Sequence, residues 1–206
     1  GLVKNHDHGD RLSNSPFMEE IQKIMAGDDV MVLVHGYLAG GFGSNKGCIT
    51  APEDVAGLSI RAAGKSFEQM LAGAGASISS MASSESFVSY RLYEQLSCYT
   101  PAGDYALWFM YQPLLMNKTT FDNLTPEQQE ALTTAAANAE AFYLQEAKKG
   151  DADAAKVFSD NGVELAEMSE ADFNAWRELA KTTSYPAFVE ETPDGQRLLD
   201  MALSVE

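Results

Sequence analysis

The sequence predicts an α/β fold, on three observations. Residues 30–34 form a continuous apolar run, which is typical of a strand buried on both faces. Residues 58–62 alternate in polarity like a second strand. At 125–128 a capping threonine, a proline at the first helical position and a glutamine that completes a capping box predict the start of a long helix. Strands that alternate with helices favour a mainly parallel sheet, in which ligands bind at the carboxyl ends of strands.

The elements of the first half follow from apolar spacing and turn residues. Residues 1–15 are polar, and Pro16 precedes an amphipathic pattern. We then expect, in order, a helix over 17–25, the strand 30–34, a glycine-rich loop over 36–47, a short helix from 50 that ends at Gly57, the strand 58–62, a helix after Gly64, a strand over 76–81 and a helix over 87–96.

The second half opens with the most apolar stretch, residues 105–116. Pro113 interrupts it, so we expect a strand with a bend. The helix that begins at 126 is expected to run to 149, with Gly150 as an interruption before 152–160. A strand over 163–168, a helix that opens at Ser169 and a last helix after 192–193 complete the chain.

Composition and charge exclude several classes of protein. The chain has 206 residues, enough for one large domain or two small lobes, and 45% hydrophobic residues rule out disorder over the whole length. The net charge of −16 argues against a nucleic-acid partner and an anionic membrane surface. An anionic ligand would need a local cationic site within this repulsive field. No apolar run approaches the length of a membrane span.

Few residues suit metal, redox or nucleotide chemistry. Cys48 and Cys98 form no CxxC pattern, and the sequence leaves open whether they pair. His6 and His8, with nearby aspartates, could hold a metal, but without a further ligand cluster we interpret residues 1–15 as a solvated polar loop and expect no metal. The loop 36–47 fails both the GxGxxG and the P-loop spacing, so we interpret it as a turn or hinge.

Arg61 is the strongest candidate for binding chemistry. It lies near a strand end among small and apolar residues, where a guanidinium can hold a carboxylate through two parallel hydrogen bonds. A structural salt bridge is the alternative. The aromatic stretch Tyr105, Trp108, Phe109 and Tyr111 fits either a core or the wall of a cleft.

Three segments stand out in order along the chain: PEDVAGLSIR at 52–61, MASSE at 81–85 and LLMNKTTFDNLTPEQQ at 114–129. Together they resemble the solute-binding proteins of TRAP (tripartite ATP-independent periplasmic) transporters, dicarboxylate-binding type. Residues 52–61 are similar to that family's P-x-D-L-x-G-L-K-I-R. The stretch through 81–85, MASSE, resembles its GA-x-P-x-x-M-P-x-S-E, and residues 114–129 resemble its L-x-M-S-K-x-x-F-x-x-L-x-P-E-x-Q. The final helices match in order and character, so the resemblance covers nearly the whole chain.

The resemblance implies a two-lobed periplasmic binding protein fold (type II-like) with long connecting helices, here incomplete. It divides the chain into a remnant of the first lobe (1–46), the second lobe (47–100), a return to the first lobe (101–143) and C-terminal elements that pack on the second lobe (144–206). It also implies a periplasmic protein, with its signal peptide removed, that captures a small carboxylate and delivers it to the TRAP membrane permease. No enzymatic activity and no cofactor are expected.

For the ligand site, the resemblance implies that Arg61 clamps the carboxylate and that Trp108 and Phe42 lie in cleft-forming segments; Tyr37 and Tyr111 complete our set of candidate ligand contacts. The sequence also departs from the family. The first lobe's opening elements and a segment after residue 85 have no counterpart, and residues 42–44 lack the second arginine of some members. Either residues of a longer protein are left out here, or the chain is a remnant that cannot close on a ligand.

Two alternative functions stay open at this point. One is a degenerate family member that binds no solute and acts as an interaction protein. The other is an α/β hydrolase, because Val34-His35-Gly36 resembles an oxyanion loop. No G-x-S-x-G elbow is present and all three histidines precede residue 36, which makes the hydrolase the weaker alternative.

Overall fold

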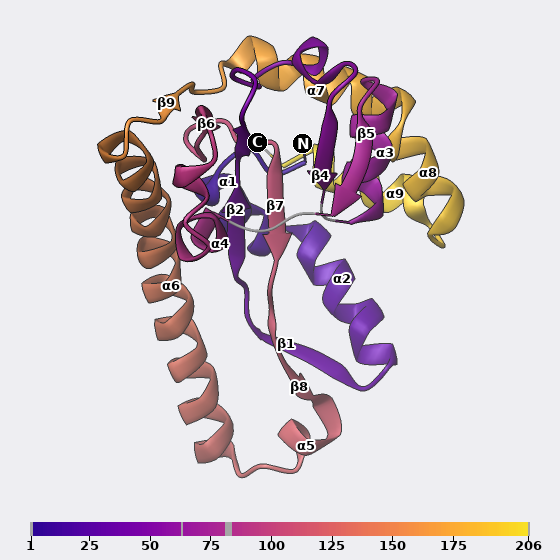
Figure 1. Cartoon of the computed structure of the whole chain (residues 1–206). Helices are drawn as coiled ribbons and strands as arrows, with labels where there is room; N and C mark the ends of the chain where they lie inside the picture. The colour runs from indigo at the N-terminus through magenta and orange to yellow at the C-terminus, as the bar shows by residue number, and fades with distance from the viewer. Residues whose placement is uncertain (1, 63, 81–83, 206) are drawn as a thin grey trace.

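The computed structural model describes residues 2–62, 64–80 and 84–205 (Figure 1). Residues 81–83 lie outside the described residues. They belong to a segment that carries part of the resemblance, and residue 81 is the last residue of the strand predicted over 76–81. The strands form four small sheets. These pair β1 (Val30–Val34) with β8 (Leu114–Asn117), β2 (Tyr37–Gly40) with β7 (Trp108–Tyr111), β3 (Phe42–Ser44) with β6 (Cys98–Thr100) and then β9 (Glu164–Leu165), and β4 (Ser59–Ala62) with β5 (Ser77–Ser80).

The α/β prediction is confirmed, but the prediction of a mainly parallel sheet is wrong. Among the described strands, β1–β8, β2–β7 and β3–β6 pair antiparallel, and only β4–β5 and β6–β9 pair parallel. The segment 30–44 and the returning segment 98–117 run past each other as one interrupted antiparallel ribbon. Its breaks lie near Pro113, as predicted, and at Gly41. Local alternation of strands and helices could not reveal this long-range return.

The glycine-rich segment 36–47 is not the predicted loop, because it contains β2 and β3. Its glycines lie where the partner strand approaches closely. A Cβ on Gly40 would meet Trp108 Cε3 at 2.5 Å, and a Cβ on Gly41 would meet the Thr100 carbonyl oxygen at 1.9 Å. Neither residue has a positive φ, so space and not backbone freedom requires glycine at these two positions.

The helices follow the predicted capping and apolar spacing. Gln128 and Thr125 form the expected capping box, with the Gln128 N–H donating to Thr125 Oγ1 at 3.3 Å. The helix that begins there runs without interruption through the exposed Gly150 and extends along one side of the molecule (Figure 1). The helices are α1 (His6–Ser13), α2 (Pro16–Gly27), α3 (Lys65–Gly73), α4 (Ser84–Ser89), α5 (Lys118–Asp122), α6 (Pro126–Asp160), α7 (Glu170–Thr182), α8 (Ser184–Glu191) and α9 (Gly195–Leu203), with 3-10 turns η1 (Pro52–Val55) and η2 (Leu92–Glu94).

Three predicted elements are shorter or divided. The helix expected over 87–96 splits into α4 and η2, because Arg91 adopts a left-handed φ of 54° between them. The short helix from residue 50 is only the 3-10 turn η1, and the strand expected over 163–168 is only the two-residue β9. Helix α8 was not predicted, because no recognised cap marks its start.

Residues 1–15 are not the solvated loop that their polarity predicts. They include α1, on which His6 and His8 are each only 7% exposed. His6 Nε2 lies 2.7 Å from Asp151 Oδ2 on α6, and His8 Nε2 lies 2.9 Å from the Val205 carbonyl oxygen. These partners are more than 140 residues away in sequence, so no local pattern could indicate them.

Among the described residues, the core consists of three apolar clusters. The largest lies between η1, β4, α3 and α7 and centres on Trp176, whose indole N–H donates to the Thr50 carbonyl at 2.8 Å. A second joins α1, β2 and α9, and a third packs α4 and β6 against α6. The division of the chain at 46, 100 and 143 stays a prediction.

Cys48 and Cys98 form a disulfide, which answers the question that the sequence left open. Their Cα atoms are 5.1 Å apart, and the bond joins the segment after β3 to the first residue of β6. Within the described ranges, no helix combines the length and the apolar character that crossing a bilayer requires.

Candidate ligand-binding site

Strand β4 presents Arg61 on its open face. Along β4 the residues alternate, with Ile60 and Ala62 buried in the largest core cluster and Ser59 and Arg61 exposed on the other side. Arg61 stands opposite Ser79 of β5 in the parallel register. The chain then turns at Gly64, with a φ of 86°, into α3, so Arg61 lies at the strand end that the sequence predicts.

A cavity of about 420 Å³ opens beside this face of β4. Its size lies within the range of small-molecule sites. The walls come from β3 and the turn that follows it, from β4, and from the segment of α4 and η2. The lining residues are Phe42, Gly43, Ser44, Asn45, Lys46, Ile49, Leu58, Ser59, Ile60, Arg61, Phe87, Tyr90, Leu92 and Leu96.

The charge of this cavity is opposite to that of the chain. Arg61 and Lys46 line it, and no aspartate or glutamate is among its described lining residues, although the chain has 30 acidic residues. Neither cation has a hydrogen-bond or ion-pair partner within the part of the chain that the structure describes. Several other exposed cations are paired, such as Lys65 with Glu191 at 2.5 Å. The cavity therefore offers two uncompensated positive charges to a ligand.

The turn that carries Lys46 is held in place from both sides. The Lys46 backbone N–H donates to Ser44 Oγ at 3.1 Å, and the Ser44 carbonyl accepts the Ser97 N–H at 2.9 Å. The Cys48–Cys98 disulfide joins the same two segments a few residues further on. A cationic turn clamped in this way loses less conformational freedom when it binds an anion.

The structure brings only one other predicted contact residue to the Arg61 cavity. Phe42 lines it, although its side chain is only 4% exposed and packs against Trp176, at a ring-centroid distance of 5.8 Å, and Phe67, at 6.1 Å. Trp108 borders a different, apolar cavity of about 470 Å³, which Phe188 and other residues of α8 and α9 also line.

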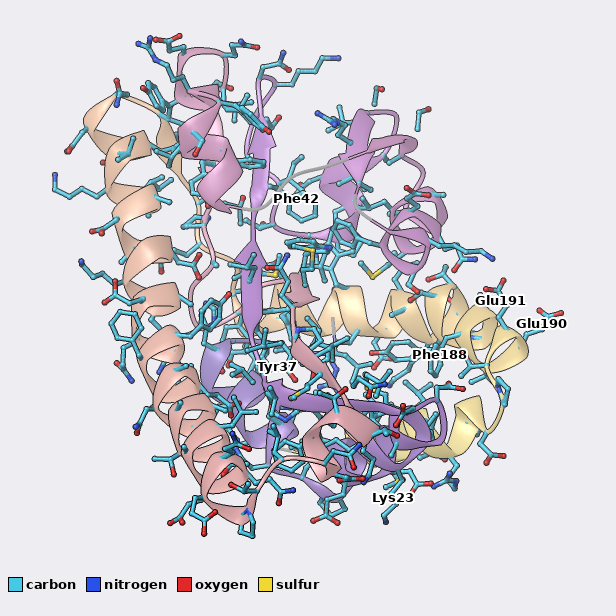
Figure 2. The ribbon with its side chains drawn as sticks, turned by 90° about the horizontal axis from the view of Figure 1, so that it is seen from below. Lys23, Tyr37, Phe42, Phe188, Glu190 and Glu191 are labelled. Carbon is cyan, nitrogen blue, oxygen red and sulfur yellow. A yellow bond between two sulfur atoms is a disulfide. The ribbon has the colours of Figure 1, made fainter. Side chains whose placement is uncertain are left out.

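Tyr37 and Tyr111 belong to a separate group, which we call the tyrosine cluster: Ser13, His35, Tyr37, Tyr111 and Glu140. The tyrosine rings lie 5.3 Å apart, Tyr111 Oη is 2.7 Å from His35 Nδ1, and Ser13 Oγ donates to Tyr37 Oη at 3.3 Å. The His35 backbone N–H donates to Glu140 Oε2 at 2.7 Å. In Figure 2, Tyr37 and Phe42 lie at different levels of the molecule, with Phe42 facing the β4–β5 unit.

Burial controls ionisation in the tyrosine cluster. It raises the pKa of both tyrosine hydroxyls, and it lowers the pKa of His35 against the opposing effect of the Glu140 carboxylate. His35 is thus favoured in its neutral form, with Nδ1 occupied by Tyr111. This arrangement satisfies polar groups within the protein, and none of these side chains lines the Arg61 cavity.

Sequence reasoning missed Lys46 as a cavity residue. In the sequence it stands out only as the residue that spoils a GxGxxG spacing. The absence of an arginine at 42–44 could have indicated Lys46. Some family members have an arginine in this segment, and Lys46 is a cation that follows within the same turn. The wall formed by Phe87, Leu92 and Leu96 had no such signal, since their helical spacing also fits a core.

Fold and site define a class, the two-lobed periplasmic binding proteins. Residues 87–191, just over half of the chain, match the DctP family, described as bacterial extracellular solute-binding protein, family 7, and the chain belongs to this family. A TRAP periplasmic solute binding protein from Rhodoferax ferrireducens, solved with bound malonate, is 28% identical with a TM-score of 0.89. The match covers 100% of this chain and 71% of that one.

Other relatives agree. A solute-binding protein from Albidiferax ferrireducens is 29% identical over 220 residues, which cover 98% of this chain; the chain spans 65% of that relative's length. A TRAP periplasmic solute binding protein from Sulfitobacter sp. NAS-14.1 is 23% identical with a TM-score of 0.77 and shares the fold, and the match covers 93% of this chain and 68% of that one. The predicted resemblance and two-lobed fold class are confirmed.

The family also decides between enzyme and receptor. Its members are solute-binding proteins and not enzymes, which confirms that prediction and removes the hydrolase alternative. The structure agrees at His35, whose Nδ1 contacts Tyr111 and whose Nε2 lies 3.5 Å from Gln22 Nε2. In this structure Val34 ends β1, and His35 belongs to the tyrosine cluster.

Proposed function

We propose that this chain is the solute-receptor part of a TRAP transporter and captures a small organic acid in the Arg61 cavity. The observation that carries the proposal is the pair of unpartnered cations, Arg61 and Lys46, in a cavity without a described acidic residue. In a chain of net charge −16, such a pair is the local exception that an anionic ligand requires.

Arg61 acts as the carboxylate clamp in this proposal. A guanidinium presents two parallel N–H groups that match the two oxygens of a carboxylate, and such charge-assisted bonds are about twice as strong as neutral ones. Leu58 and Phe42 add apolar surface to the wall of the cavity, and less polar surroundings strengthen a charge-assisted bond. Of the five predicted contacts, we assign direct contact to Arg61 and Phe42. The other three have positions in the adjacent apolar cavity or the tyrosine cluster.

Two further features of the whole protein belong to the proposal. The 28%-identical relative holds malonate, a carboxylate, which supports the ligand class. Membership of an extracellular solute-binding family supports delivery of the ligand to a TRAP membrane permease and a periplasmic location. The Cys48–Cys98 disulfide supports an oxidising compartment, where such bonds persist.

The lobe assignment is likewise ours. Residues 1–46 and 101–143 share the ribbon pairs β1–β8 and β2–β7, which supports their assignment to one lobe. Most of the largest core cluster comes from residues 47–100 and α7, which supports the grouping of that segment with 144–206 in the other lobe; Phe42 and Leu107 join the cluster from the first. A carboxylate held between such lobes is enclosed when they close, as in other hinged binding proteins.

The test is titration calorimetry of Arg61→Ala with malonate and a panel of small carboxylates. Loss of one partner of a charge-assisted pair is expected to weaken binding about 30-fold or more, with the melting temperature nearly unchanged because Arg61 is exposed. Lys149→Ala is the matched control, since it removes an exposed, unpartnered cation of the described chain outside the cavity. Unchanged affinity in Arg61→Ala would contradict the clamp, and no heat from any acid with the unaltered chain would favour the non-binding interaction protein.

A further inference from the structure

We propose that Cys48, Cys98 and Glu164 form a redox-gated site for a zinc ion. The disulfide closes this site in the oxidised chain, and reduction of the disulfide opens it. None of the three residues lines the Arg61 cavity, so the inference does not depend on the proposed carboxylate function. The sequence shows no CxxC pattern, and the fold alone brings the carboxylate to the two sulfur atoms.

Three ligand groups meet where β6 lies between β3 and β9 (Figure 1). The sulfur atoms of Cys48 and Cys98 and a carboxylate oxygen of Glu164 all lie within 4.8 Å of one another. Within the ranges that the structure describes, this is the one such group of histidine, cysteine or acidic side chains. Two ligand atoms of one zinc ion, each about 2.0–2.3 Å from it, are at most about 4.6 Å apart. Small side-chain rotations therefore bring all three groups within reach of one ion.

Backbone pairing holds Glu164 beside Cys98. The two residues are partners in the parallel register of β6 and β9. The Glu164 N–H donates to the Ser97 carbonyl at 3.1 Å, and two residues further on the Ala166 N–H donates to the Tyr99 carbonyl at 3.1 Å. The position of the carboxylate thus depends on strand pairing and not on the state of the sulfur atoms.

Cys48 is likewise held against β6 from both sides without its sulfur atom. Before it, the Ser97 N–H donates to the Ser44 carbonyl at 2.9 Å. After it, the buried Thr100 hydroxyl donates to the Ile49 carbonyl at 2.6 Å. Reduction of the disulfide leaves these hydrogen bonds in place, so the two thiols remain neighbours in the folded chain.

The chemistry of the ligand set selects the ion. Thiolates favour zinc over magnesium and calcium, which prefer oxygen ligands. The Glu164 side chain is exposed and has no hydrogen-bond or ion-pair partner in the described part of the chain, so it is free to coordinate. Three protein ligands leave the fourth tetrahedral position of zinc to water.

A dithiol is the reductant that opens the site. It passes two electrons to the disulfide: the bond between the two cysteine sulfurs breaks, the dithiol closes to its own disulfide, and its two protons pass to the cysteines. Zinc then forms two zinc–sulfur bonds and releases these two protons. The ion thereby replaces the disulfide as the link between the segment after β3 and β6.

The experiment measures zinc binding by the full chain in competition with a chromophoric chelator. The chain is used oxidised, or reduced with a dithiol that gel filtration without oxygen then removes. Reduction should tighten zinc binding about 100-fold or more, since loss of an outer-shell partner alone costs about 10–100-fold. In the reduced chain, Cys48→Ser and Glu164→Gln should each weaken binding about 10-fold or more. Glu167→Gln is the matched control, an exposed carboxylate of the same segment outside the ligand group. Cobalt(II) should show sulfur-to-cobalt charge-transfer absorption only with the reduced chain.

Several results would overturn the site. These are no zinc uptake by the reduced chain, equal affinity of the oxidised and reduced chains, an equal effect of Glu164→Gln and Glu167→Gln, and a cobalt spectrum without sulfur charge transfer. Circular dichroism follows the fold of the reduced chain. In an unfolded chain the cysteines are 50 residues apart and Glu164 is not beside them, so its zinc affinity would not respond to Glu164→Gln and the inference would fail.

Discussion

The Arg61 cavity and the tyrosine cluster both combine aromatic with polar side chains, and they differ in whether their polar groups have partners. In the cavity, Arg61 and Lys46 face open space and no described residue pairs with them. In the tyrosine cluster, the hydroxyls of Tyr37 and Tyr111 are occupied by Ser13 and His35. The comparison teaches that unpartnered polar groups, and not aromatic content, distinguish the proposed ligand site from the tyrosine cluster.

Both regions are built on the same antiparallel ribbon. Strand β2 passes through the tyrosine cluster, and β3, only two residues further along, borders the cavity. Gly41 is the junction between them. The segment 30–44 therefore contributes both to the tyrosine cluster, whose polar groups have partners within the protein, and to the wall of the Arg61 cavity.

The largest expected effect sharpens the contrast in how the two regions are held together. Removing the disulfide with the double variant Cys48→Ala, Cys98→Ala should lower the free energy of unfolding by about 4 kcal/mol, because the bond closes a loop of 50 residues in the unfolded chain. Urea denaturation with and without dithiothreitol measures this. The unaltered chain should respond to the reductant and the variant should not. A change below about 1 kcal/mol would mean that the β3–β6 pairing holds the cavity wall without the bond.

Gly41→Ala tests the junction between the two regions. A Cβ placed 1.9 Å from the Thr100 carbonyl oxygen must move backbone, so we expect a loss of about 3 kcal/mol in the free energy of unfolding. Thermal and urea denaturation measure the loss. Gly103→Ala is the control, because a Cβ there meets nothing within 4 Å. A neutral Gly41→Ala would support the flexible hinge that the glycine-rich sequence first indicated.

Tyr111→Phe distinguishes the tyrosine cluster from the cavity directly. It leaves His35 Nδ1 without the hydroxyl at 2.7 Å, which should cost about 1–3 kcal/mol of stability and leave carboxylate affinity unchanged. Tyr90→Phe, at a side chain 70% exposed, is the stability control. A roughly tenfold loss of malonate affinity in Tyr111→Phe at unchanged stability would place the tyrosine cluster in the ligand site and break the comparison.

The smallest expected effect is a pH dependence of stability that the ligand affinity of the Arg61 cavity does not share. Burial lowers the pKa of His35 and of His8 below the ordinary value of about 6.5, so the unfolded chain binds protons that the folded chain does not. Stability should therefore be fully present above about pH 6.5 and decline as the pH falls below it. No described residue that lines the cavity is a histidine or an acid, so malonate affinity should stay level between about pH 6 and 8.

Urea midpoints at about pH 5 and 7.5 test the stability half of this prediction, with calorimetry at about pH 6 and 8 for the affinity half. His35→Gln should reduce the difference between the two midpoints. An affinity that changes steeply over this range would assign a titrating group to the cavity.

Local patterns in the sequence determined much of the secondary structure. The capping box at Thr125, the strand over 30–34 and the break at Pro113 were all predicted, because caps, apolar runs and proline act on the residues next to them. The expected burial of that strand on both faces is wrong, since only Val32 of β1 is buried. The position of Arg61 at the end of β4 followed from alternation alone. The order of short segments along the chain was also enough to indicate the family.

The tertiary structure decided the features that depend on distant partners. Polarity suggested that His6 and His8 are solvated, but packing against α6 and the C-terminal residues buries them. Glycine content suggested a loop over 36–47, but the approach of Trp108 and Thr100 makes those glycines part of strands. The five candidate contacts were separated into three environments, and Lys46 was added, only where segments distant in the sequence meet around the cavity. A sequence specifies which groups can bind, whereas the fold decides which of them remain unpaired, because hydrogen bonds and burial depend on neighbours in space.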